Sequence, residues 1–164
     1  MKRLLAWLLG AGLLLGLAAC GAPEPREQQT CTISISCAVL LEQLDRLPAA
    51  KQVLVPEDGW LLPPTEVSFT PGETVFDVLQ RETRARSIHM EFSSTPLYNT
   101  AYIEGIGNLY EFDCGESSGW MFSVNKTFPT LGCSACPVEQ GDQIAWQYTL
   151  SLGEDLGEST GGPS

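Results

Sequence analysis

Alternating apolar and polar positions are clearest in two segments near the C-terminus, residues 118–125 and 141–150. The apolar residues of each segment share one face: Trp120, Phe122 and Val124 in the first, and Ile144, Trp146, Tyr148 and Leu150 in the second. A period of two with aromatic and β-branched residues is typical of strands that bury one face. We therefore expect two strands with matching apolar faces, which together form the densest part of the core.

Helical periodicity indicates two helices upstream of these strands. Residues 38–47 carry four leucines at helical spacing and stop before Pro48, which predicts a short amphipathic helix. Residues 74–86 begin with Thr74 and Asp77, a pair that resembles a capping box, and continue with an apolar face. We expect both stretches to be helices.

Shorter apolar runs indicate the remaining strands. They lie at 31–36, 53–55, 65–70 and 88–92, followed by three glycine-separated pieces at 101–103, 105–107 and 109–112. The order strand, helix, strand, helix and then several strands predicts the α+β class. We expect a mixed sheet with the two helices packed on one of its faces.

The N-terminus has the pattern of an export signal. A short basic start is followed by an apolar stretch, residues 4–19, that ends in Leu17-Ala18-Ala19-Cys20. This ending resembles the lipobox of bacterial lipoproteins, which implies cleavage before Cys20 and a lipid anchor on its thiol. The alternative is an uncleaved membrane helix, but the stretch is short and is interrupted by three glycines. We expect residues 1–19 to be a signal peptide and the protein to face outside the cytoplasm.

The composition divides the mature chain into three parts. Residues 20–30 are polar and proline-containing, as in a flexible tether. Residues 31–153 are long enough for one domain with a single core. Residues 154–164 consist mainly of Gly, Glu, Asp, Ser and Pro, so we expect a disordered tail.

The charge of the chain restricts its partners. Removal of residues 1–19 takes away Lys2 and Arg3, which lowers the net charge of −11 by two units. Nucleic acid and anionic lipid headgroups are not expected as partners, because no basic patch remains to contact phosphate. A cationic or neutral ligand is compatible with this charge, and so is the plainer interpretation that the charge serves solubility.

Five cysteines remain after Cys20: Cys31, Cys37, Cys114, Cys133 and Cys136. Disulfides persist outside the cytoplasm, and an odd number leaves at least one thiol unpaired within the chain. Cys31 and Cys37 lie on an extended run, where their Cα atoms would be about 20 Å apart, beyond disulfide reach. Cys114 and Cys133 flank the strand at 118–125 and are the expected disulfide.

Cys133 and Cys136 form a C-x-x-C motif. A redox motif of this type should open a helix after a strand, whereas Pro137 and a turn follow here. A zinc site would need a second ligand pair, and the only histidine is the distant His89. A structural disulfide or chance spacing is the preferred interpretation, and we expect no metal site.

Five segments within residues 65–153 match the pattern of a known family: 69–79 (FTPGETVFDVL), 102–106 (YIEGI), 111–115 (EFDCG), 118–125 (SGWMFSVN) and 141–146 (GDQIAW). In these segments the chain resembles a bacterial family of unknown function that is related to the C-terminal domain of transcobalamin and intrinsic factor. That family usually has glycine after Val-Asn, where this chain has Lys126. A positive φ in this turn must therefore rest on Asn125.

The resemblance implies a β-grasp-like fold over residues 31–153 and the binding of a small molecule, with cobalamin or another corrinoid as the candidate ligand. In the transport proteins this small domain closes over cobalamin that is held against a separate helical barrel. No stretch of this sequence resembles that barrel, so the resemblance also implies a partner protein that supplies the other half of a ligand site. No covalently bound cofactor is expected.

Aromatic residues near loop ends are the candidates for ligand contact. They are Tyr98, Tyr102, Trp120 and Phe128. For Trp120 the plainer interpretation is core packing, because it heads an alternating strand.

For three further motifs we prefer a structural or chance interpretation to a functional one. Residues 115–119 spell the G-x-S-x-G pattern of hydrolases, but a strand follows Ser117 and the only histidine precedes it. Residues 125–127 spell a glycosylation sequon, which we treat as chance in a bacterial lipoprotein. Glu111, Asp113 and Glu116 could supply oxygens to calcium, but a solvated acidic turn is the preferred interpretation. We expect no catalytic residues and no enzyme activity.

Two functional hypotheses follow. The first is a membrane-anchored lipoprotein outside the cytoplasm that binds a small molecule such as a corrinoid. The alternative is a surface interaction domain that contacts protein or glycan without a small-molecule ligand.

Overall fold

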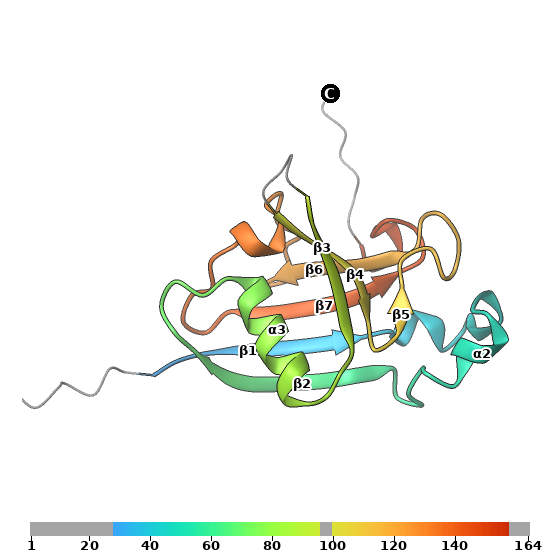
Figure 1. Ribbon diagram of the computed structural model, residues 1–164, viewed down its shortest axis with the longest axis horizontal. Helices are drawn as coiled ribbons and strands as arrows, with labels where there is room; N and C mark the ends of the chain where they lie inside the picture. Colours follow the sequence, from blue (N-terminus) through green and yellow to red (C-terminus); the bar gives the residue numbers. More distant parts are fainter. Residues whose placement is uncertain (1–27, 96–99, 158–164) are drawn as a thin grey trace, which may run out of the picture.

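The computed structural model of the chain describes residues 28–95 and 100–157, and its main feature is a four-stranded mixed sheet in the order β2-β1-β7-β6. The strands are β1 (Gln29–Ser36), β2 (Trp60–Phe69), β6 (Gly119–Val124) and β7 (Gln143–Thr149). The central strands β1 and β7 are parallel, and each has an antiparallel neighbour on its outer side (Figure 1). This β-grasp-like arrangement confirms the expected α+β class.

One face of this sheet is covered by α3 (Val75–Ala85) and by a second sheet made of β3 (Met90–Thr95), β4 (Thr100–Ile106) and β5 (Leu109–Tyr110). Figure 1 shows α3 and β3 crossing in front of the larger sheet. The buried core between the layers includes Ile33 and Ile35 of β1, Val78 of α3, Ile103 of β4 and Trp146 of β7. Ile33 and Ile35 of β1, and Ile144 and Trp146 of β7, are buried at every second position, as strand periodicity predicts.

The two aromatic-rich C-terminal strands pair as expected. Trp120 lies opposite Tyr148, and Phe122 lies opposite Trp146. The Phe122 and Trp146 rings have centroids 5.1 Å apart. Cross-strand aromatic pairs of this kind stabilise an antiparallel pair beyond the area that they bury.

A capping box starts α3, as the sequence predicts. The Asp77 amide donates to the Thr74 hydroxyl (3.3 Å), and the Thr74 amide donates to the Asp77 carboxylate (2.8 Å). These two bonds satisfy amide groups that a helix N-terminus otherwise leaves unpaired.

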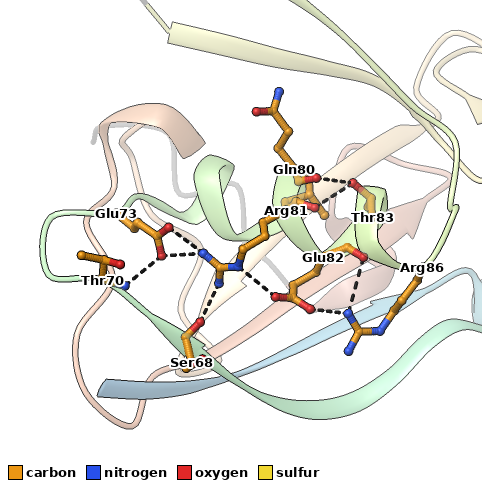
Figure 2. A network of polar contacts seen from close by, with 9 residues as sticks. Ser68, Thr70, Glu73, Gln80, Arg81, Glu82, Thr83 and Arg86 are labelled. Atoms are coloured by element: carbon orange, nitrogen blue, oxygen red, sulfur yellow. Dashed lines mark hydrogen bonds and ion pairs between the residues drawn. The ribbon is translucent and has the colours of Figure 1, made fainter. Parts of the chain in front are cut away.

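An ion-pair network ties α3 to the end of β2 (Figure 2). The Arg81 guanidinium donates to Glu73 (2.6 Å), to the Ser68 carbonyl oxygen (2.7 Å) and to Glu82 (3.1 Å). Arg86 donates to the second oxygen of Glu82, which is buried. Arg81 therefore connects the helix to β2, and the pair of Glu82 and Arg86 lies within the helix and its C-terminal cap.

The segment between β1 and β2 differs from the expectation. Residues 38–47 form two 3-10 turns, η1 (Ala38–Leu40) and η2 (Leu44–Arg46), and α2 (Ala49–Gln52) follows. Of the leucines, Leu40 and Leu47 are buried and Leu41 is exposed, so they do not share one helix face. Neither turn has a capping side chain. Pro48 directly precedes α2 instead of ending a helix, which its fixed φ and missing amide proton allow.

Three strand boundaries also differ. Residues 53–55 are a turn after α2 and not a strand. β2 runs through Pro63 and Pro64, which an edge strand tolerates because its outer amide groups have no strand partner. The expected pieces at 101–103 and 105–107 are joined in β4, which ends at Ile106.

The ends of the domain are described only in part. Cys20, residues 1–19 and most of the tether at 20–30 lie outside the described residues, although Gln29 and Thr30 already belong to β1. At the other end, Glu154–Leu156 form a 3-10 turn, η4, where a disordered tail was expected. No helix within residues 28–95 and 100–157 has the length and apolarity that a membrane span requires.

Candidate functional site

The face of the four-stranded sheet that points away from α3 carries small polar side chains. Thr32, Ser34 and Ser36 alternate along β1 with the core residues Ile33 and Ile35. Because strand residues alternate between faces, these hydroxyls point to the side opposite the core. This outer face is therefore the natural place to look for a binding surface.

A row of three small residues crosses the middle of this face. Ala145 of β7 pairs with Ser34 of β1 on one side and with Ser123 of β6 on the other. Larger side chains stand in the next row toward each end of the strands: Gln143 lies beside Thr32, and Gln147 lies beside Ser36. The sheet surface is therefore hollow along the row of small residues.

This hollow, which we call the trough, has a volume of about 450 Å³. Its floor comes from β1, β7 and Ser123 of β6, and its rims carry larger side chains at the two edges of the sheet. Trp60 and Pro64 come from the edge strand β2, and Lys126 and Phe128 follow the opposite edge strand β6. The residues that line the trough are Thr32, Ser34, Ser36, Trp60, Pro64, Ser123, Lys126, Phe128, Gln143, Ile144, Ala145, Gln147 and Leu156.

Several polar groups of the trough are available to a ligand. The Ser36 hydroxyl is engaged, since it donates to the Gly59 carbonyl oxygen (3.3 Å) and accepts from the Ala38 amide (3.1 Å). Within residues 28–95 and 100–157, the side chains of Thr32, Gln143, Gln147 and the buried Ser123 make no hydrogen bond, and neither does that of Lys126. These hydroxyl and amide groups can donate to or accept from a bound molecule.

A tight turn holds one rim of the trough. Asn125 and Lys126 both have positive φ, 53° and 66°, and the Val124 and Thr127 backbones exchange two hydrogen bonds of 2.9 and 3.0 Å. The Asn125 side chain donates to Asp142 (2.7 Å) and accepts from the Gln143 amide (3.0 Å). The expected positive φ of Asn125 is confirmed, and Lys126 adopts one as well. Both central residues of a type I′ turn require it.

The three candidate aromatics that the structure describes do not come together. Phe128 lines the trough, and Tyr98 lies outside the described residues. Tyr102 is on β4 and is 48% exposed, and its hydroxyl donates to Glu111. Burial of the phenol and the neighbouring Glu111 raise the pKa of Tyr102 to about 12. Tyr102 therefore belongs to the second sheet and not to the trough.

Trp120 is half-buried and packs against the core. Its ring lies edge to face against Tyr148, with centroids 5.3 Å apart, and its indole N–H donates to the Leu109 carbonyl oxygen (2.8 Å). Trp120 contacts both hydrophobic clusters of the domain. This placement agrees with the plainer interpretation of its position on an alternating strand.

The structure does not form the expected disulfide between Cys114 and Cys133. All five described cysteines are free thiols. The first cluster contains Cys31, Cys133 and Cys136, and the second contains Cys37 and Cys114. Cys114 precedes β6 and Cys133 follows it. Because β6 has six residues and is about 20 Å long, two cysteines that flank it in the sequence need not lie close together in space. Burial raises the pKa of Cys31, Cys37 and Cys133 to about 11.

The other motifs have structural roles. The Ser118 hydroxyl accepts from the Cys114 amide (3.0 Å) and donates to the Gly115 carbonyl oxygen (2.8 Å), which closes the loop before β6. Asp113 pairs with Lys51 (2.6 Å), and Glu111 accepts from Tyr102. Among the described residues, no group of three or more His, Cys, Asp or Glu side chains is placed to hold a metal ion.

The sequence prediction named aromatic residues as the ligand contacts and therefore missed most of the trough. The signal that could have revealed it is the polar half of the Thr-Ile-Ser-Ile-Ser run in β1. Hydroxyl residues at every second position imply an open, polar sheet face. Ala145 and Ser123 join that face only through strand pairing.

Comparisons with known proteins agree with the fold. Residues 72–149 match the family model described as "Domain of unknown function (DUF4430)". A solved structure of haptocorrin in complex with Cbi matches with a TM-score of 0.57 and 12% identity, covering 83% of this chain and 28% of that chain. The solved structure of a candidate metal binding protein from Ruminococcus gnavus ATCC 29149 matches with a TM-score of 0.47 and 12% identity, covering 74% of this chain and 97% of that chain. No curated protein matches the sequence.

The haptocorrin match shows a shared fold with the small part of a longer protein, since this chain covers 28% of the haptocorrin chain. The match at residues 72–149 includes α3, the three-stranded sheet and the strands β6 and β7 of the trough, whereas β1 and β2 lie outside it. The family described by this match carries no assigned function.

Proposed function

We propose that this protein is a binding module, anchored to the membrane through a lipid on Cys20 and facing outside the cytoplasm, whose trough binds a small molecule. The observation that carries the proposal is the row of small residues Ser34, Ala145 and Ser123, which hollows an otherwise flat sheet face. A concave site with a few free polar groups and apolar rims is the usual form of a small-molecule site.

The chemistry of the trough favours a flat ligand with polar substituents. Trp60 and Phe128 offer apolar rims, and the hydroxyls of Thr32 and Ser123 can bond to amide or hydroxyl groups. A corrinoid, which is a flat macrocycle with amide side chains, fits this description. The shared fold with haptocorrin, whose solved structure contains Cbi, supports testing cobalamin and cobinamide first.

Among the described residues, those that line the trough lie on one sheet face, at its two edges and in η4 (Leu156), and none of them covers the floor. A ligand bound there keeps one side open to solvent. We propose that a partner protein covers that side and supplies the other half of the ligand site. Affinity in the absence of the partner is then limited, since only half of the ligand surface is buried.

We propose binding and not catalysis. The lining side chains supply hydroxyls, amides and one ammonium group. A hydroxyl nucleophile needs a base within hydrogen-bond reach, and no carboxylate or imidazole is among the residues that line the trough.

Titration calorimetry of the full chain with cobalamin and with cobinamide tests the proposal. Ala145 is half-buried at the centre of the trough floor, so Ala145→Tyr fills the trough without entering the core. Ser94→Tyr is the matched control, because Ser94 is exposed on β3 of the other sheet. We expect saturable binding in the native chain and in Ser94→Tyr and its loss in Ala145→Tyr. Absence of saturable heat at high micromolar concentrations of both ligands would rule out the corrinoid.

A further inference from the structure

Among the described residues that line the trough, a single side chain is charged, and it is basic. The lining residues include Lys126 and no aspartate, glutamate or arginine. The whole chain carries a net charge of −11, so a positively charged site is the opposite of what the composition leads one to expect. A cationic ligand, which the composition alone would allow, therefore meets a charge of its own sign in the trough.

Most other basic side chains are engaged within the protein. Arg46 donates to the Cys114 carbonyl oxygen (2.7 Å), Lys51 pairs with Asp113 (2.6 Å), and Arg81 and Arg86 belong to the network with Glu82 in Figure 2. Among the described residues, Arg84 and Lys126 are the two lysine or arginine side chains without an ion pair or a hydrogen bond. Of these two, only Lys126 lines the trough.

Lys126 also occupies a backbone position that disfavours it. Its φ is 66°, in the left-handed region where a residue with a Cβ atom is strained and glycine is not. The turn is held closed from both sides by the hydrogen bonds of Asn125 to Asp142 and Gln143. A lysine is thus fixed at the rim of the trough at a position where glycine would be the more stable choice.

We propose that Lys126 recognises an anionic group, a carboxylate or a phosphate, on the ligand of the trough. The inference rests on the proposed function, because it concerns the ligand of the same site. In this arrangement the flat part of the ligand lies on the row of small residues between Trp60 and Phe128. Its anionic group lies at the rim formed by the turn at residues 124–127.

Matched pairs of flat aromatic compounds test this proposal without assuming a corrinoid. Indole-3-acetate and indole-3-acetamide differ by one charge, and phenyl phosphate tests phosphate against carboxylate. Binding to the full chain is measured by ligand-observed NMR. We expect the anionic member of the indole pair to bind about fivefold more tightly, which is the size of a partly exposed ion pair.

Four variants assign this preference to Lys126. Lys126→Gln and Lys126→Gly remove the charge, and the second also removes the backbone strain, so misfolding cannot explain its effect. Lys126→Arg keeps the charge, and Arg84→Gln removes a charge from α3 outside the trough. We expect the preference for the anion to disappear in the first two variants and to persist in the last two.

The outcomes separate this inference from the proposed function. Suppose that both indole compounds bind equally to the native chain and that neither binds to Ala145→Tyr. This result would overturn the role of Lys126 and leave the trough as a ligand site. A preference for the anion that survives in Lys126→Gly would also overturn it. If neither the aromatic compounds nor the corrinoids bind, both proposals fail.

Discussion

Trp120 and Tyr148 lie ring against ring across the β6–β7 pair, with centroids 5.3 Å apart and planes at 78°. Both rings are also fixed by their polar ends: the Trp120 indole N–H donates to Leu109 (2.8 Å), and the Tyr148 hydroxyl donates to the Tyr110 carbonyl oxygen (2.7 Å). The pair therefore joins the C-terminal strands to β5. These contacts give the pair a structural role.

Trp120→Ala should accordingly destabilise the protein. We expect a loss of about 3 kcal/mol in the free energy of unfolding, from the lost ring contacts and the cavity that remains. Trp120→Phe keeps the ring and loses the hydrogen bond to Leu109, so its loss should be smaller, about 1 kcal/mol. Denaturant unfolding measures both. If Trp120→Ala left stability unchanged but abolished ligand binding, Trp120 would be a ligand residue after all.

Substitutions of Asn125 and Lys126 in the turn should change the free energy of unfolding in opposite directions. Asn125→Ala removes the hydrogen bonds to Asp142 and Gln143 and leaves a Cβ residue at positive φ, so we expect a loss of about 2 kcal/mol. Lys126→Gly removes the strain at φ 66°, and we expect a gain of about 0.5 kcal/mol. Thermal unfolding of both variants measures these changes. A lower melting temperature for Lys126→Gly would contradict the left-handed turn.

Stability should fall at alkaline pH because of the buried thiols. Burial raises the pKa of Cys31, Cys37 and Cys133 from 9.0 to about 11. Below pH 9 these thiols are protonated in both states, so stability does not depend on them. Above pH 9 they ionise in the unfolded chain first, so the free energy of unfolding decreases as pH rises toward 11.

Chemical denaturation between pH 8 and pH 11 measures this decrease, with the flanking range of pH 7 to 8 as the baseline. Cys31→Ala should make the decrease shallower, because one buried thiol is removed. A free energy of unfolding that rises over this range would contradict the burial of the thiols.

The lipid anchor can be tested by counting thiols. The sequence contains six cysteines, and a thioether on Cys20 leaves five free thiols after denaturation in the mature protein. We expect mass spectrometry to show cleavage before Cys20 and an added diacylglycerol. The Cys20→Ser variant should lose the lipid and leave the membrane fraction. Six reactive thiols in protein isolated from membranes would rule out the anchor.

Local sequence signals predicted much of the fold. The strands β6 and β7 follow from strict alternation, and α3 follows from the Thr74–Asp77 capping box, because both signals lie within a few residues. The prediction of one helix at 38–47 is wrong, because leucines at helical spacing do not by themselves make a helix face. In the structure, Leu40 and Leu47 are buried and Leu41 is exposed, so the segment meets the core through two separate turns.

The trough could not be predicted in the same way. Its floor joins Ser34 to Ala145 and Ser123, residues about 90 to 110 positions apart in the sequence. They become neighbours only because β1 and β7 pair in parallel, and nothing local to either strand specifies that pairing. Phe128 follows from its place in a loop, and among the candidates within the described residues it is the one that lines the trough.

The central claim is that a ligand binds on the row of small residues and not at Tyr102 of the second sheet. The most direct test is chemical-shift mapping of the labelled full chain during titration with cobalamin, cobinamide and indole-3-acetate. We expect the largest saturable changes at the backbone amides of Ser34, Ser123 and Ala145. Changes confined to Tyr102 and Glu111, or no saturable change with any of the three ligands, would contradict the claim.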